Sequence, residues 1–174
     1  MGTGIQRLED YTHPILGVFE RTQHTTPSQG TYVRLTKRGS TTIVSLGYEF
    51  PEFSISLREI VEPPAAMVAD LVRLLHWPES RRHEIEERLL QHYASNRSRY
   101  VDEMRENGYS DQRIEKAAPP ISEPASVRKL IVRPRYINAG TWPHVSVAFD
   151  TTYDAEHELH IAFQNDRVVR LWDE

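Results

Sequence analysis

The sequence predicts an α+β fold, with antiparallel strands at both ends of the chain and a central helical segment, about residues 65–117, packed on the sheet. Apolar and polar residues alternate near both ends, as in strands with one buried face, whereas apolar residues in the middle recur at helical spacing. The 174 residues suffice for one domain with a hydrophobic core. With 39% hydrophobic and 26% charged residues, the composition is typical of a globular protein. We therefore expect residues 1–174 to form a single domain.

The N-terminal third is predicted to be a strand meander over about residues 15–57, preceded by an arm of 13 residues. Its strands are rich in β-branched and aromatic residues and are expected over residues 15–20, 31–36, 41–47 and 53–57. The polar stretch from Lys37 to Ser40 is expected to be a turn, in which Gly39 supplies a positive φ.

Two helices and a short third one are predicted in the middle of the chain. The first covers about residues 65–76 and ends at Trp77, because a residue before proline is pushed out of helical geometry. The second covers about residues 79–107, with Gly108 as its left-handed cap and a short helix from Ser110 following. Its apolar stripe consists of Ile85, Leu89, Tyr93, Tyr100, Val101 and Met104.

The C-terminal strands are predicted over about residues 127–172. A short helix over 125–130 and a strand over 131–137 are both compatible with the pattern at their start. Alternation then predicts one strand over 145–149 and another from His157 to Phe163, with a loop rich in acids between them. Asn165-Asp166 is expected to form a two-residue hairpin turn, since both residues tolerate positive φ. A terminal strand follows over 168–172.

The composition excludes several classes of protein. The chain has no cysteine, which excludes disulfides, zinc–thiolate sites and cysteine nucleophiles and makes the cytoplasm the expected location. No apolar run approaches the ~20 residues that a membrane span requires, and the first residues lack the layout of a signal peptide. The net charge of −4 argues against binding to nucleic acid and is compatible with a basic protein partner.

The most suggestive set of side chains is Asp150, Asp154, Glu156 and His157, between two predicted strands. Carboxylates and an imidazole could bind a divalent metal or act as acid and base, although the spacing does not match a calcium loop of the EF-hand type. We favour a structural role, in which Asp150 and Asp154 cap the turn and His157 is an inward residue bonded to one of them. No catalytic residue, metal site or cofactor is therefore predicted, and the four residues remain the alternative metal site.

Other candidate sites are weaker. His83 lacks the second histidine, four residues later, that a metalloprotease helix needs, because position 87 is Glu87. A basic cluster at residues 128–135 lacks the interleaved aromatic residues of a nucleic-acid surface, so a solvated sheet edge is expected. Trp142, which precedes Pro143, is the candidate for contact with a partner, because tryptophan is a strong anchor at interfaces.

A set of short motifs gives the C-terminal part, about residues 119–172, a family resemblance. They are Pro120-Ile121-Ser122, Leu130-Ile131-Val132-Arg133-Pro134, Phe149-Asp150, Tyr153-Asp154, Glu156-His157, Leu159 and Val168-Val169. On these motifs the chain resembles an uncharacterised bacterial family of small α+β proteins. Tyr153 replaces the tryptophan, and Glu158 the glycine, that such sequences usually have.

The resemblance implies no known catalytic activity. In size and style the family is similar to immunity proteins, which block bacterial toxins by direct binding. We therefore expect a non-enzymatic protein-binding domain whose partner is a cognate toxin or effector, with no nucleic acid and no membrane involved. One alternative is a hydrolase-like metal-binding module that uses Asp150, Asp154, Glu156 and His157. The other is a structural or adaptor subunit of a phage or secretion assembly.

Overall fold

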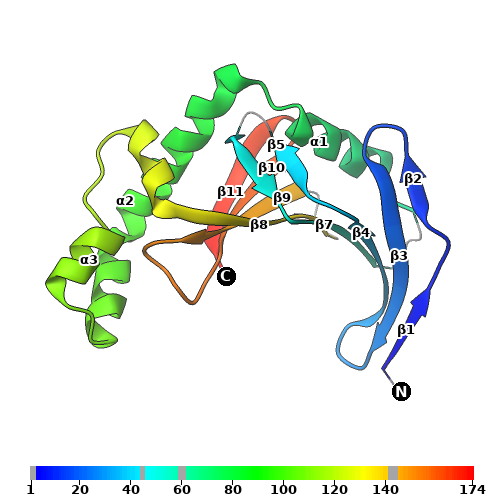
Figure 1. The fold of residues 1–174 in the computed structure, drawn as a ribbon, viewed down its shortest axis with the longest axis horizontal. Coiled ribbons are helices and arrows are strands. Elements are labelled where there is room, and N and C mark those ends of the chain that lie inside the picture. The colour runs from blue at the N-terminus through cyan, green and yellow to red at the C-terminus, as the bar shows by residue number, and fades with distance from the viewer. Residues whose placement is uncertain (1–2, 44–45, 59–61, 141–144) are drawn as a thin grey trace.

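The structure is a computed structural model and describes residues 3–43, 46–58, 62–140 and 145–174 (Figure 1). The chain folds as one α+β domain, with strands at both ends and the long helix between them, which confirms the predicted fold class. Trp142, the predicted partner contact, lies outside the described residues.

A large sheet of nine strands is formed by the described residues, in the order β1-β3-β4-β7-β8-β9-β10-β11, with β2 also paired to β3. Its strands are β1 (Gly4–Arg7), β2 (Tyr11–His13), β3 (Gly17–Thr26), β4 (Gly30–Lys37), β7 (Glu52–Arg58), β8 (Ile131–Ala139), β9 (Val145–Thr151), β10 (Leu159–Gln164) and β11 (Arg167–Asp173). The N-terminal and C-terminal strands meet at the pair β7–β8, where Phe53 lies opposite Ile137. This pair is parallel, and the other neighbours in the sheet are antiparallel.

The predicted N-terminal meander is wrong in its pairing. Strand β4 pairs with β7, whereas β5 (Thr41–Ile43) pairs with β6 (Tyr48–Phe50) in a separate two-stranded sheet. The small sheet lies over the same face of the large sheet as the helices (Figure 1), where Ile43 and Phe50 are fully buried in the core. Burial of these two side chains favours a separate β5–β6 sheet over a simple meander. The predicted N-terminal arm contains strands β1 and β2, which cover the edge of β3.

The helices follow the prediction closely. They are α1 (Ala65–Leu75), α2 (Arg82–Glu106) and α3 (Asp111–Ala117), with 3-10 segments η2 (Glu79–Arg81) and η3 (Pro124–Leu130). The six predicted stripe residues of α2 are all buried, and Gly108 closes this helix at φ +77°. Both structures considered for residues 125–137 occur, because η3 leads directly into β8. None of the described helices combines the length and the apolar character needed to cross a membrane.

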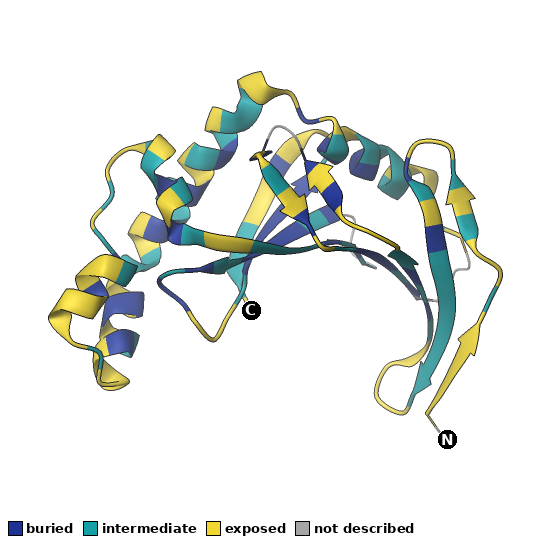
Figure 2. Cartoon of the chain, in the orientation of Figure 1, coloured by how far each residue is buried: buried dark blue, intermediate teal, exposed yellow. Residues whose placement is uncertain are grey.

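The hydrophobic core lies on one face of the large sheet. Helices α1 and α2 cover that face, and the buried residues gather beneath them (Figure 2). Edge-to-face ring contacts join the layers, with centroid distances of 5.5 Å between Phe50 of β6 and Phe149 of β9 and 5.1 Å between Trp77 and Phe163 of β10. The opposite face of the sheet has no described helix packed on it (Figure 1).

The predicted hairpin between β10 and β11 is confirmed. Asn165 and Asp166 adopt φ values of +49° and +64° and form its two-residue turn. The backbone N–H of Asn165 donates to Oδ1 of Asp70 in α1 over 3.1 Å, which fixes the hairpin to the helical layer. The pairing shifts register after Ala162, so that Val169 is a bulge residue with no partner on β10.

Candidate functional site

The acidic loop, residues 152–158 between β9 and β10, is organised by Asp154. This aspartate is only 8% exposed, and its Oδ1 accepts the backbone N–H groups of Glu156 at 3.1 Å and His157 at 3.0 Å. The Nδ1 atom of His157 lies 3.1 Å from both carboxylate oxygens. Asp154 therefore caps the turn, as predicted from the sequence.

The predicted roles of Asp150 and His157 need correction. Asp150 does not cap the turn, because its side chain lies against β8, where it pairs with Arg133 and, over 3.5 Å, with Arg135. His157 does bind Asp154, but it is not an inward strand residue. Its side chain is 50% exposed, and β10 begins only at Leu159, because the cap on Asp154 holds the preceding residues in the turn.

Of the four residues of the alternative metal site, the structure brings Asp154 and His157 into contact, but it places the carboxylate of Asp150 elsewhere. The carboxylate of Asp150 is engaged by two guanidinium groups on the outer face of the sheet. That of Asp154 is engaged by the backbone of its own loop. Within the described residues, no three histidine, aspartate or glutamate side chains are placed to share an ion.

Replacement of Asp154 by alanine is expected to lower the free energy of unfolding by about 2 kcal/mol, because two backbone N–H groups lose the buried carboxylate that accepts their hydrogen bonds. Urea denaturation followed by circular dichroism measures the change. The matched variant His157→Ala removes the imidazole contact but leaves both backbone bonds, so a loss of at most about 0.5 kcal/mol is expected. Equal losses in the two variants would contradict the capping role.

A hollow of about 310 Å³ lies between this loop and the C-terminal end of α2. We call it the acidic cleft. It is lined by carboxylates, aromatic rings and a methionine, among them Tyr100, Glu103, Met104, Tyr109, Asp154 and Glu156. Glu103 forms an ion pair with Arg99, which also pairs with Asp173. Glu156 is exposed and has no ion-pair partner in the described part of the chain. The cleft thus combines negative charge with aromatic faces.

Three tyrosines form the floor beneath the cleft. The ring of Tyr153 lies 4.4 Å from that of Tyr100 and 5.0 Å from that of Tyr93, measured between centroids. Burial raises the pKa of Tyr153 well above its usual value, so the ring is neutral. The hydroxyl of Tyr93 donates to the backbone oxygen of Pro119 over 2.8 Å. Tyr153, part of the aromatic–Asp motif, therefore anchors the loop that Asp154 caps.

Asp173 joins β11 to α2 through a network that the sequence analysis missed. Its Oδ2 accepts a hydrogen bond of 2.6 Å from the Tyr100 hydroxyl and one of 3.0 Å from Arg99, and His92 lies 3.3 Å away. Burial would raise the pKa of Asp173, but the bonds from His92 and Tyr100 outweigh it and lower the pKa. Burial and the bond to Asp173 raise the pKa of Tyr100.

Comparison with known protein families identifies the family of this chain. The model of a domain of unknown function, DUF6985, matches residues 24–173. The chain belongs to this family. The matched region includes the acidic loop, the acidic cleft and the Asp173 network, and it leaves β1 and β2 outside. No curated protein and no solved structure matches the chain.

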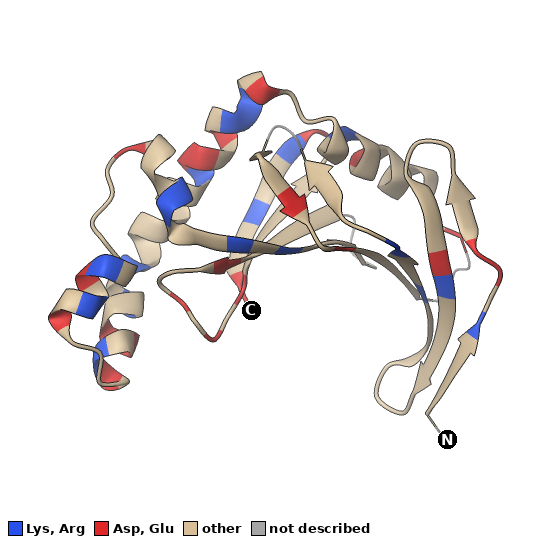
Figure 3. Ribbon diagram, in the orientation of Figure 1, with Lys and Arg blue, Asp and Glu red and all other residues tan. Residues whose placement is uncertain are grey.

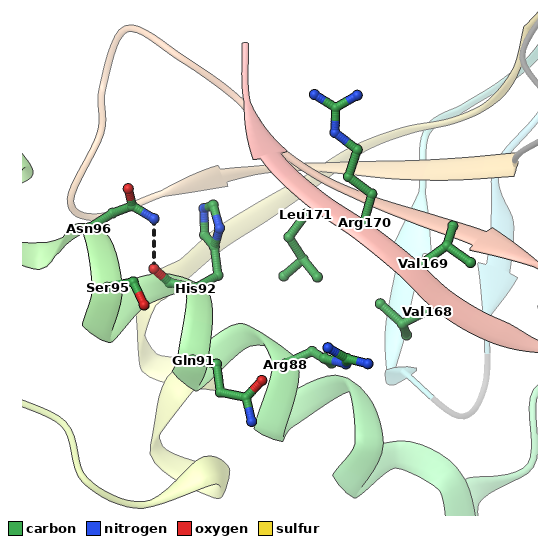
Figure 4. A pocket seen from close by; sticks show the side chains of 9 residues that line it. All are labelled: Arg88, Gln91, His92, Ser95, Asn96, Val168, Val169, Arg170 and Leu171. Atoms are coloured by element: carbon green, nitrogen blue, oxygen red, sulfur yellow. Dashed lines mark hydrogen bonds between the residues drawn. The ribbon is translucent and has the colours of Figure 1, made fainter.

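A second hollow, of about 300 Å³, lies within the family match between α2 and β11 (Figure 4). We call it the basic groove. Its helix wall carries Arg88, His92 and Asn96, and its strand wall carries Val168, Arg170 and Leu171. Neither Arg88 nor Arg170 has an ion-pair partner among the described residues, and no described aspartate or glutamate lines the groove. Arg88 therefore gives the groove a positive charge, and Arg170 adds a second one on the other side of β11.

The three arginines of the basic cluster predicted near the start of β8 are paired with carboxylates. Arg128 pairs with Glu86, Arg133 with Asp150 and Arg135 with Glu158. The predicted sheet edge is wrong in its position, because β8 lies between β7 and β9 in the large sheet.

His160, on the face of the sheet without helices, makes the stability of the fold depend on pH. It is 6% exposed and stacks on Trp172 at 4.8 Å, and burial lowers its pKa although Glu174, Glu158 and Asp173 oppose the shift. The imidazole of His160 therefore binds a proton more readily in the unfolded chain than in the folded one. Its contribution to stability is complete above about pH 6.5 and falls as the pH drops toward the folded pKa.

Denaturation from pH 7.5 to 5 should show a shallower pH dependence of stability for His160→Phe than for the wild type. Identical slopes would contradict the assignment.

Proposed function

We propose that this domain is a non-enzymatic protein-binding domain of the immunity type, which neutralises a basic cytoplasmic partner, such as a cognate toxin or effector, by direct contact. The acidic cleft is the observation that supports this proposal. Its hollow of about 310 Å³ is open to a partner and carries Glu103, Asp154 and Glu156 beside Tyr100 and Tyr109.

The chemistry of the cleft fits an arginine or lysine side chain. Carboxylates accept charge-assisted hydrogen bonds from a guanidinium group, and aromatic faces attract cations. The domain already makes such a contact beside the cleft, where the guanidinium carbon of Arg113 lies 4.5 Å from the centroid of the Tyr109 ring. A partner arginine in the cleft would use the same ring chemistry together with the free carboxylate of Glu156.

The scaffold beneath the cleft supports tight binding. Tyr153 is 3% exposed and wedged against two other tyrosines, and Asp154 fixes the loop backbone. A preordered loop loses little conformational entropy when a partner docks, so more of the contact energy appears as affinity. The net charge of −4 would also speed association with a basic partner.

The test is co-expression with the product of the neighbouring gene in a host cell. We expect the neighbour to inhibit growth alone, the domain to restore growth, and the two proteins to purify as a complex. A neighbour that is not toxic and does not bind would overturn the immunity role.

A pair of charge-matched variants tests the cleft. Glu103→Gln/Glu156→Gln is expected to weaken the complex at least about tenfold, measured by calorimetric titration, because two carboxylates of the cleft lose their charge. Glu9→Gln/Glu115→Gln makes the same change in net charge at exposed positions outside the cleft and should leave affinity nearly unchanged. Equal weakening by both pairs would show that net charge, and not the cleft, drives binding.

A further inference from the structure

Strand β11 ends the large sheet on its C-terminal side. It pairs with β10 alone, and no described strand lies on its other side. An unpaired strand edge presents a row of backbone N–H and C=O groups, which can accept a further strand from another chain.

The orientation of these groups follows from the last pair of the ladder. Glu158 and Glu174 exchange two backbone hydrogen bonds, of 2.8 and 3.0 Å. In an antiparallel ladder such pairs alternate with pairs whose N–H and C=O groups point away from each other. Since Leu171 lies opposite Ile161, three positions from the Glu174 pair, its N–H and C=O point to the outer edge of the sheet, beside the basic groove. Asp173 has the same orientation.

Two arginines flank this edge. The side chain of Arg88 extends from α2 toward β11, whereas that of Arg170 extends from the strand to the side away from the helix (Figure 4). Basic residues occur on both α2 and β11 (Figure 3). A strand added at Leu171 would therefore meet one guanidinium group on each of its two faces. Because consecutive side chains of a strand point to opposite faces, two adjacent acidic residues would satisfy both arginines.

The acidic groups nearby are already committed. Asp173 binds Tyr100, Arg99 and His92, and Glu84 and Asp166 both pair with Arg81. Glu174, which follows β11, accepts a hydrogen bond of 3.1 Å from the indole N–H of Trp172. The guanidinium carbon of Arg170 lies 5.0 Å from the centroid of the Trp172 ring, a contact that does not neutralise its charge. The positive charge of Arg88 and Arg170 can therefore attract an acidic ligand. The bulge at Val169, which is 45% exposed, interrupts the edge and limits pairing to the residues that follow it.

We propose that the basic groove binds an extended segment of a partner protein, with two adjacent acidic residues at its centre, as an additional strand on β11. This surface is distinct from the acidic cleft and of opposite charge. The proposal therefore does not depend on the proposed function.

The probe is the capped hexapeptide threonine-valine-glutamate-glutamate-valine-threonine, added to the full chain labelled with nitrogen-15. We expect the backbone amide signals of Leu171 and Asp173 and those of the groove face of α2 to shift, and the signals of the acidic cleft to stay in place. Two modified peptides separate the contributions. Replacement of both glutamates by lysine, or N-methylation of alternate backbone nitrogens, should reduce binding at least about tenfold.

Two protein variants complete the test. Arg88→Glu/Arg170→Glu should weaken peptide binding at least about tenfold, whereas Lys116→Glu/Lys129→Glu, which makes the same charge change at exposed residues outside the groove, should not. A peptide that produces no shifts at β11 overturns the proposal. So does an N-methylated peptide that binds as well as the parent, or an oligonucleotide that shifts the same signals with higher affinity. Loss of toxin binding in the cleft variants would not affect any of these outcomes.

Discussion

Replacement of Tyr153 by alanine is expected to lower the free energy of unfolding by about 4 kcal/mol, within the range for large aromatic residues removed from a core. Tyr153 is 3% exposed, and its ring contacts those of Tyr93 and Tyr100 with centroid distances of 5.0 and 4.4 Å. Its removal leaves a cavity beneath the acidic loop and frees that loop from α2. Urea denaturation followed by circular dichroism gives the change in stability.

The control for this variant is Tyr153→Phe, which keeps the ring and removes only the hydroxyl. It should cost at most about 1 kcal/mol. If the alanine variant also lost less than about 1.5 kcal/mol, the ring would not anchor the loop. Because the loop forms one wall of the acidic cleft, the alanine variant is also expected to bind a cleft partner more weakly, whereas the phenylalanine variant should bind it as the wild type does.

Replacement of Asp173 by alanine is expected to cost about 3 kcal/mol. The change leaves the hydroxyl of Tyr100 and the imidazole of His92 without their acceptor at the junction of β11 and α2. Arg99 adds little to this figure, because its side chain is 46% exposed and water can replace the carboxylate. Thermal and urea denaturation at neutral pH measure the loss.

The pH dependence gives Asp173 a second signature. Since its folded pKa is lowered, its contribution is complete above the unfolded value of about 3.9 and is lost as the pH falls through the folded pKa. The stability difference between the wild type and Asp173→Ala should therefore be constant near neutral pH and shrink below about pH 4. Glu103→Gln is the control. It removes only an exposed ion pair with Arg99 and should change stability by at most about 0.5 kcal/mol.

Local patterns in the sequence predicted local structure well. The apolar stripe of α2, its cap at Gly108 and the turn at Asn165-Asp166 are each decided by residues close together in the chain. The order of the strands was not predictable in this way. Alternation shows that a segment is a strand but not which strand it pairs with. The separate β5–β6 sheet and the parallel pair β7–β8 were therefore not predicted.

The same distinction applies to the candidate site. The cap on Asp154 uses backbone groups two and three residues away and was predicted. Asp150 was assigned wrongly because its partners, Arg133 and Arg135, come from the neighbouring strand. Asp173 was missed because its partners lie on α2, far away in sequence. The one signal for Asp173 in the sequence was a carboxylate next to the apolar residues Leu171 and Trp172.

The parallel pair β7–β8 also has a consequence for how the chain acquires its structure. Four residue pairs join the two halves of the sheet there, and between the two strands the chain first passes through all three α-helices. Contacts so distant in sequence carry a large loop-closure cost, which slows folding. During synthesis, the edge of β7 stays unpaired until β8 has left the ribosome. In that interval the nascent chain is most exposed to mispairing, and a chaperone would be most useful to it.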